Sequence, residues 1–117
     1  MIVENKRNKK KIKCEKACTL LSKVRGLMFR KEIIPILFDF FRDDIHAIHS
    51  FFVPAPFYAI YISSSGEVVD KFRVVPSEAH RQNSKPARYL LEIDEKRAAW
   101  FEKEDKVVVH ARVENTK

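Results

Sequence analysis

Two histidines and two cysteines would have the most specific chemistry in this sequence if they met in space. His46 and His49 are three positions apart, and Cys14 and Cys18 are four apart. Imidazole and thiolate groups are the usual ligands of zinc. Neither pair has the Cys-x2-Cys spacing of a zinc site, and a free cysteine commonly acts as a small buried hydrophobe. We therefore expect no metal site and no cofactor, and we interpret His49 as a core histidine or a pocket group.

Residues 25–30 form a second group, which could bind an anion. They read Arg-Gly-Leu-Met-Phe-Arg. The N–H groups of a turn at Gly26, with the guanidinium groups of Arg25 and Arg30, could hold an anion. The structural alternative is that Gly26 ends a helix and the apolar residues pack inward. The candidate ligand-binding residues are Arg25, Gly26, Arg30, His49 and Tyr58.

Catalytic groups do not form a recognisable set. Nucleophilic catalysis needs Cys or Ser beside a histidine base, and no motif such as Gly-x-Ser-x-Gly places them together. With only two glycines, the chain cannot build a Gly-rich phosphate loop. Asp39 and Glu92 could act as a carboxylate pair, or each could be an outward or salt-bridged sheet residue that meets Arg88 or Arg25. We assign no catalytic residue, and an enzyme of unrecognised type is the last of our hypotheses.

The positive charge of the chain is concentrated at one end. The formal net charge is +7, and six of the 23 Lys and Arg residues lie within residues 1–13, with Glu4 as their only acidic neighbour. Lys9, Lys10, Lys11 and Lys13 could bind nucleic-acid phosphates with strong salt dependence. This segment contains no aromatic residue to stack on bases, and a basic run is commonly a solvated sheet edge. Non-specific nucleic-acid binding is therefore the alternative hypothesis.

Length and composition indicate one domain. The chain has 117 residues, of which 45% are hydrophobic, which is enough for a core. Its N-terminus has no apolar segment, so we expect no signal peptide or membrane anchor. Two cysteines without an export signal favour the reducing cytoplasm. We expect a single cytoplasmic domain over residues 1–117, with a basic hairpin or arm at 1–13, no membrane partner, and an oligomeric state left open.

The most apolar stretch, residues 51–62, is the centre of the expected fold. Pro54 and Pro56 interrupt it, because proline cannot donate to a sheet ladder. Residues 57–62 are apolar on both faces and predict a strand covered on both sides. Gly66 then allows a hairpin turn, and residues 68–74 predict a half-buried returning strand with Val68, Phe72 and Val74 on one face.

Shorter elements complete the prediction. Strands are expected at 2–3, 11–17, 36–41, 45–52, 88–93 and 106–113, helices at 20–27 and 95–102, and an ordered surface loop at 76–86. Asp94 is a good N-cap for the second helix. The fold class is therefore mainly β (α+β), a compact antiparallel sheet or barrel-like sandwich with two short helices.

Taken in order, several segments resemble the family called domain of unknown function 192, in an archaeal-style variant. The Arg-Gly-Leu-Met-Phe-Arg box is the most specific part. The supporting segments are 37–40, 49–52, 57–62 and 91–93. The resemblance covers about residues 11–110. It implies a compact, mostly β domain with no established biochemical activity.

The sequence departs from this family at four places. The family usually has methionine where Val53 stands and aspartate where Tyr58 stands. It has a glycine near Lys96, and a Gly-Asp pair where Glu104 and Asp105 stand. The resemblance therefore implies a fold and a possible binding surface rather than a mechanism. The leading hypothesis is a non-catalytic module that binds a small ligand or a protein.

Overall fold

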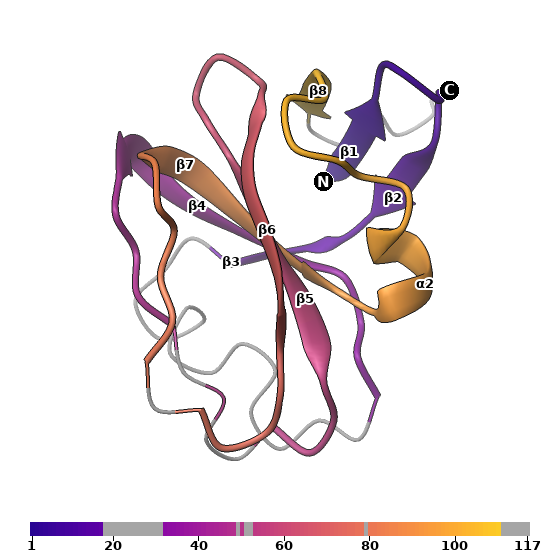
Figure 1. The fold of residues 1–117 in the computed structure, drawn as a ribbon. Coiled ribbons are helices and arrows are strands. Elements are labelled where there is room, and N and C mark those ends of the chain that lie inside the picture. The colour runs from indigo at the N-terminus through magenta and orange to yellow at the C-terminus, as the bar shows by residue number, and fades with distance from the viewer. Residues whose placement is uncertain (18–31, 49, 51–52, 79, 111–117) are drawn as a thin grey trace.

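The computed structural model describes residues 1–17, 32–48, 50, 53–78 and 80–110 (Figure 1). The helix expected at 20–27 and four candidate ligand-binding residues, Arg25, Gly26, Arg30 and His49, lie outside these ranges. The described elements are β1 (Ile2–Asn5), β2 (Lys11–Lys13), β3 (Glu15–Ala17), β4 (Ile36–Asp44), β5 (Phe57–Ile62), β6 (Val68–Val74), β7 (Ala87–Ile93), α2 (Glu95–Ala98) and β8 (Val107–His110). The mainly β fold class is confirmed.

The strands form two sheets that do not close into a barrel. A three-stranded sheet has the order β2-β1-β8, and a five-stranded sheet has the order β3-β4-β7-β5-β6. All pairs are antiparallel except β3 with β4, which is parallel. The strand expected over 11–17 divides at Cys14, so β2 belongs to one sheet and β3 to the other. Figure 1 shows the three-stranded sheet and α2 on one side of the five-stranded sheet.

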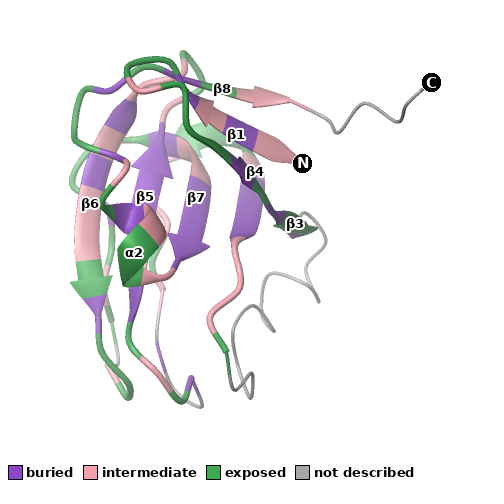
Figure 2. Cartoon of the chain, turned by 90° about the vertical axis from the view of Figure 1, so that its right-hand side faces the viewer, coloured by how far each residue is buried: buried purple, intermediate pink, exposed green. Residues whose placement is uncertain are grey.

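Both faces of the five-stranded sheet are covered, as the apolar pattern of residues 57–62 predicts. Ile60 and Ile62 of β5 pack with residues of the three-stranded sheet and α2. Phe57, Ala59 and Tyr61 belong to the cluster on the opposite face. Figure 2 shows β5 and β7 as largely buried strands, with α2 in front of β5. A carboxyl group on either face of these strands is therefore withdrawn from water.

Residues 45–52 were expected to form a strand, and this prediction is wrong for the residues of the segment that the structure describes. Only Ile48 makes an isolated bridge, to Arg81. The backbone groups are satisfied by the loop instead: the His46 N–H donates to Asn83 Oδ1 (2.8 Å) and the Ile48 N–H to the Arg81 carbonyl (2.7 Å). These bonds attach Arg81 and Asn83 of the 76–86 loop to this segment.

The β5–β6 hairpin is present, but β6 does not keep one apolar face. A register shift lies between Tyr61, which pairs with Asp70, and Ile62, which pairs with Val68. The extra residue reverses the alternation of side chains. Val68 consequently packs in the cluster between the two sheets, whereas Phe72 and Val74 pack on the other face.

Helix α2 is capped as predicted but is shorter than predicted. The Asp94 carboxylate accepts a hydrogen bond from the Arg97 N–H (3.2 Å), and the helix ends at Ala98 instead of continuing to 102. The Trp100 and Phe101 N–H groups then bond three residues back, to Arg97 and Ala98. Tight turns of this kind replace the last expected helical turn. No helix in the described ranges is long and apolar enough to cross a membrane.

Glu104 occupies a backbone conformation that favours glycine. Its φ is 76°, and it stands where the resembled family has the glycine of its Gly-Asp pair. We expect Glu104→Gly to raise the free energy of unfolding by about 0.5–1 kcal/mol, since glycine takes this conformation without Cβ strain. Urea denaturation would measure the change. The neighbouring Glu102→Gly should instead lower stability, and a loss in both variants would contradict the argument.

Candidate functional site

The turn between β1 and β2 is held in one conformation by its own backbone. The Asn5 N–H donates to the Lys10 carbonyl (2.9 Å), and the Lys9 N–H donates to the Asn5 carbonyl (2.8 Å). Lys9 has a φ of 63° in the left-handed region. Asn5 Oδ1 accepts from the Arg7 N–H (2.9 Å). We call β1, β2 and this turn the basic hairpin, and it confirms the predicted hairpin with the basic residues at its tip.

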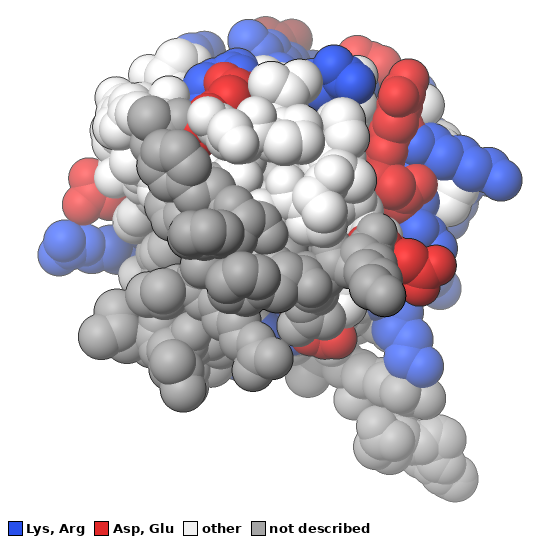
Figure 3. Space-filling model, turned by 90° about the horizontal axis from the view of Figure 1, so that it is seen from below, with Lys and Arg blue, Asp and Glu red and all other residues white. Residues whose placement is uncertain are grey.

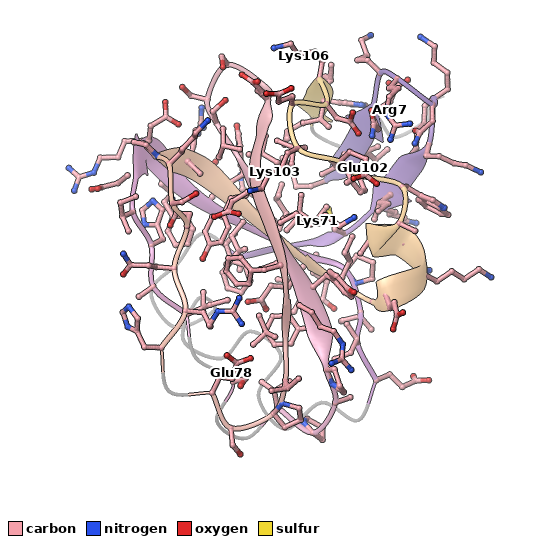
Figure 4. All side chains as sticks on the ribbon, in the orientation of Figure 1. Arg7, Lys71, Glu78, Glu102, Lys103 and Lys106 are labelled. Atoms are coloured by element: carbon pink, nitrogen blue, oxygen red, sulfur yellow. The ribbon has the colours of Figure 1, made fainter. Side chains whose placement is uncertain are left out.

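Asp105 anchors the basic hairpin to the loop before β8. Its carboxylate accepts from Arg7 Nε (2.8 Å) and Nη2 (3.0 Å), from Asn5 Nδ2 (2.8 Å) and from the Glu102 N–H (2.8 Å). The hydrogen bonds from Arg7 are the main reason that the pKa of the Asp105 carboxyl is lowered to about 2, against the opposing effect of burial. Figure 4 shows Arg7 near the loop that carries Glu102.

Trp100, the only tryptophan of the chain, lies against the tip of the basic hairpin. Its carbonyl accepts hydrogen bonds from Asn5 Nδ2 and Asn8 Nδ2, both at 2.8 Å. The Lys10 ammonium lies 5.1 Å from the centroid of the partly exposed indole ring. The fold therefore supplies, from residue 100, the aromatic group that the basic segment itself lacks.

The lysines of the basic hairpin are exposed, and within the described ranges no carboxylate lies within ion-pair distance of them. They are Lys6, Lys9, Lys10, Lys11 and Lys13. Lys103 and Lys106 elsewhere lie 3.6 Å from Asp70 and Glu67. On the face shown in Figure 3, acidic and basic side chains lie side by side at one margin. The hairpin thus carries five exposed lysines with no ion-paired carboxylate among the described residues, and Glu4 of β1 lies opposite Lys11 on the ladder.

Tyr58 is the one candidate ligand-binding residue that the structure describes. It pairs with Ile93 of β7 and Arg73 of β6, and it packs against the cluster between the sheets. The Lys71 ammonium lies 6.0 Å from its ring centroid. The hypothesis of a ligand site at Arg25, Gly26, Arg30, His49 and Tyr58 stays a prediction.

Asp39 and Glu92 do not form a carboxylate pair. Asp39 lies opposite Tyr89 on the β4–β7 ladder, whereas Glu92 lies opposite Ile36, three positions away. Arg88 Nε and Nη2 donate to the two Asp39 oxygens at 3.0 and 3.1 Å. Burial would raise the pKa of Asp39, but the hydrogen bonds from Arg88 and the Phe41 N–H outweigh it and lower that pKa. Asp39 is therefore a salt-bridged sheet residue that meets Arg88, which is one of the two alternatives that the sequence left open for it.

Glu92 does not point outward, and among the residues that the structure describes it forms no salt bridge. Only 5% of the residue is exposed, although it is a glutamate in the central strand β7. No hydrogen bond or ion pair to its carboxyl is found among the residues that the structure describes, and burial alone shifts its pKa. Burial raises its pKa to about 8. The sequence did not indicate this, because the alternation of β7 does not say that both of its faces are covered.

His46 packs against an aromatic ring, and Cys14 is buried. The His46 ring stacks on the Phe40 ring, with 3.7 Å between the ring centroids. The backbone carbonyl of His46 accepts a hydrogen bond from the Tyr61 hydroxyl (2.8 Å). Cys14 is buried, and burial raises the pKa of its thiol to about 11. Across the described part of the chain, no three metal-ligating side chains gather. Cys14 thus acts as the small buried hydrophobe expected of it.

The model of the family DUF192, described as "Uncharacterized ACR", matches residues 1–110. The chain belongs to the DUF192 family. The match includes the basic hairpin, which lies mostly outside the segment in which the sequence resembles the family. No curated protein matches this chain significantly.

Two solved structures share the DUF192 fold seen here. A protein of unknown function from Novosphingobium aromaticivorans DSM 12444 superposes with a TM-score of 0.82 and 23% identity, over 92% of this chain and 82% of that chain. A Sinorhizobium meliloti 1021 protein, described as a "putative transcription regulator", superposes with a TM-score of 0.78 and 22% identity, over 92% of this chain and 89% of that chain. At this identity the likeness shows the fold alone.

Proposed function

We propose that this protein is a binding module for single-stranded nucleic acid and that the basic hairpin is its contact surface. One observation carries the proposal: the hairpin presents five exposed lysines without carboxylate partners in the described chain, and its turn packs on Trp100. The hypothesis of nucleic-acid binding came from the lysines alone. The position of Trp100 adds the aromatic group that the hypothesis lacked.

Charge supplies the sequence-independent part of the proposed binding. Lysine ammonium groups that contact phosphates release counterions, so affinity falls steeply as salt rises. Arg7 is already engaged by Asp105, so the remaining cations of the hairpin are Lys6, Lys9 and Lys10 at the tip and Lys11 and Lys13 along β2. A phosphate backbone would meet little competition from acidic side chains there.

The indole ring supplies the proposed preference for single strands. Unpaired bases stack on aromatic side chains, at about 1–3 kcal/mol per base, whereas bases within a duplex are already stacked. The Lys10 ammonium and the Trp100 ring are 5.1 Å apart, a separation at which one nucleotide could contact both. The bonds from Asn5 and Asn8 to the Trp100 carbonyl hold the turn in place before binding, which reduces its entropic cost.

One solved structure with this fold has a description that agrees with a nucleic-acid partner. The Sinorhizobium meliloti protein is described as a "putative transcription regulator", and transcription regulators act at nucleic acids. Its 22% identity to this chain makes this a supporting point only. The hairpin geometry remains the basis of the proposal.

The direct test is a titration with single-stranded oligothymidylate of about 16 nucleotides, a length within the site sizes of small single-strand binders. Because Trp100 is the only tryptophan, quenching of intrinsic fluorescence would report contact at the proposed surface. Replacing Lys9, Lys10 and Lys11 by alanine should weaken binding about tenfold or more. It should also lower the salt slope by about 2, since each lost phosphate contact accounts for about 0.7.

A matched variant separates the hairpin from net charge. Replacing Lys16, Lys85 and Lys103, which are exposed elsewhere, removes the same charge and should leave affinity and salt slope nearly unchanged. Trp100→Leu should weaken binding of a labelled oligonucleotide without changing the salt slope. Trp100→Phe should retain much of the affinity, because phenylalanine keeps an aromatic ring at this position. Equal losses in both lysine triples, or equal affinity for duplex and single strand, would rule out the proposal. So would stronger quenching by vesicles of anionic phospholipid.

A further inference from the structure

Strand β2 is an outer strand of the three-stranded sheet, and its ladder fixes which backbone groups face away from β1. The order of the sheet is β2-β1-β8, so β2 has a neighbouring strand on one side only. At the two ends of β2, the Lys10 carbonyl accepts a hydrogen bond from β1 and the Cys14 N–H donates one to Met1, both at 2.9 Å. Because hydrogen-bonded positions alternate along an antiparallel pair, the N–H and C=O groups of Lys11 and Lys13 point outward.

Strand β6, an outer strand of the five-stranded sheet, shows the contrasting arrangement. The Lys71 N–H donates to Asp70 Oδ1 (2.9 Å), and the Arg73 carbonyl accepts from Arg81 Nη1 (3.1 Å). At the start of the strand, the Val68 N–H and carbonyl bond to the backbone of the loop before β8. Another chain could therefore not bond along β6 without breaking contacts that the protein already makes.

Among the described residues, no group closes the outer edge of β2 in this way. The Lys11 and Lys13 side chains are exposed and lie on one face of the strand, since alternate residues point the same way. Lys10, beside Trp100, precedes them along the chain. Lysines on an edge strand oppose pairing with a second protein strand, so the partner that fits this edge is one rich in negative charge.

We infer that the backbone of a bound single strand lies along the outer edge of β2, where the N–H groups of Lys11 and Lys13 donate to successive phosphates. This inference rests on the proposed function and adds the backbone groups that hold the strand. Two residues along a β-strand advance about 7 Å. Successive phosphates of an extended nucleic-acid strand are separated by about the same distance, so each N–H group faces one phosphate.

The chemistry of this edge matches that of a phosphate backbone. Phosphate oxygens accept hydrogen bonds from backbone N–H groups, and such contacts position a strand without reading its sequence. The ammonium groups of Lys11 and Lys13 are close enough along the chain to neutralise the same phosphates. From a base stacked on Trp100, the strand passes Lys10 and then follows β2. A protein strand would also need the outward C=O groups, whereas a phosphate backbone leaves them in water.

Alanine and proline at the same position separate the N–H group from the charge. Lys11→Ala removes the ammonium group, and Lys11→Pro also removes the N–H, at an edge position where a sheet tolerates proline. Lys11→Pro should bind oligothymidylate about fivefold more weakly than Lys11→Ala, a ratio that one hydrogen bond of about 1 kcal/mol would produce. Both variants should lower the salt slope equally. Arg73→Pro and Arg73→Ala, at an outward position of β6, should bind alike.

Amide NMR of the unmodified protein gives a second readout, which does not depend on whether a variant folds. On addition of oligothymidylate, the amide protons of Lys11 and Lys13 should move downfield, as new hydrogen bonds to phosphate require. The amide proton of Ile12, which faces β1, should move little.

Equal affinities of Lys11→Pro and Lys11→Ala, or unmoved Lys11 and Lys13 amide protons in the presence of bound oligothymidylate, would overturn the inference. If Trp100 fluorescence is still quenched in that case, the proposed function stands without it. No binding by the unmodified protein would overturn both. Tighter binding of a polyglutamate peptide than of oligothymidylate would mean that the edge takes a protein strand, which would also overturn the inference.

Discussion

Raising the pH from about 5 to about 9 should lower the free energy of unfolding by on the order of 4 kcal/mol through Glu92 alone. The pKa of Glu92 is about 8 in the folded protein, against 4.5 for an ordinary glutamate. The folded state therefore binds this proton more tightly than the unfolded chain does. A loss of this size is comparable with the whole stability of a small domain.

The direction of this effect follows from the two protonation states. The contribution of protonated Glu92 is fully present below about pH 4.5, where the carboxyl group is neutral in both states. It is lost as the pH rises through about 8, because the unfolded chain is then favoured by a solvated carboxylate. Tyr61, on the same face, does not offset the loss, since burial raises its own pKa far above this range.

Urea unfolding followed by circular dichroism across this pH range would measure the effect. Glu92→Gln removes the titrating group, so its stability should vary little between pH 5 and 9 and should exceed that of the unmodified protein at the alkaline end. Glu95→Gln, an exposed glutamate in the first turn of α2, should keep the original pH dependence. A flat profile for the unmodified protein would contradict the burial of an isolated carboxyl group.

Asp105→Ala should lower the free energy of unfolding by about 2–4 kcal/mol. The substitution removes the acceptor of four hydrogen bonds, from Arg7, Asn5 and the Glu102 N–H. Asn5 is fully buried, so its amide would lose a partner that water cannot easily replace. The three-stranded sheet depends on this carboxylate, because it joins the hairpin to the loop before β8.

Arg7→Ala is the matched comparison for this prediction. Arg7 is about half exposed, with 51% of its side chain accessible, so solvent screens its ion pair and the loss should be clearly smaller than that for Asp105→Ala. The pKa of Asp105 is about 2, lowered from 3.8, so its stabilising contribution is present above pH 3.8 and is lost as the pH falls through about 2. Thermal unfolding at pH 7 and at pH 2 would measure both. A larger loss for Arg7→Ala than for Asp105→Ala would show that Asp105 is not the anchor.

Local patterns in the sequence predicted the elements that depend on neighbouring residues. Gly66 has a φ of 87°, and a Cβ there would lie 2.6 Å from the Val107 carbonyl oxygen, so the turn requires glycine. Asp94 caps its helix because a short carboxylate reaches back to the N–H groups of the first turn. The basic hairpin also follows from local alternation around a polar turn.

Patterns that depend on partners distant in sequence were not predictable in the same way. The bulge in β6 and the loop bonds of residues 45–48 arise because a particular ladder or loop carbonyl faces them. Alternation along one strand does not reveal where its ladder with a partner strand admits an extra residue. The described residues of the expected 45–52 strand do not form a strand for this reason.

The sequence by itself determined the mainly β class, the family, the central hairpin and the position of the basic charge. Each rests on residue types and on spacings of a few residues. Only the tertiary structure placed Trp100 beside Lys10, joined Asp105 to Arg7 and buried Glu92 without a partner in the described chain. The residues of the first two contacts are at least about ninety positions apart in the sequence. The burial of Glu92 depends on whether a second layer covers its strand. Packing between layers decides them, and a linear pattern carries no record of that packing.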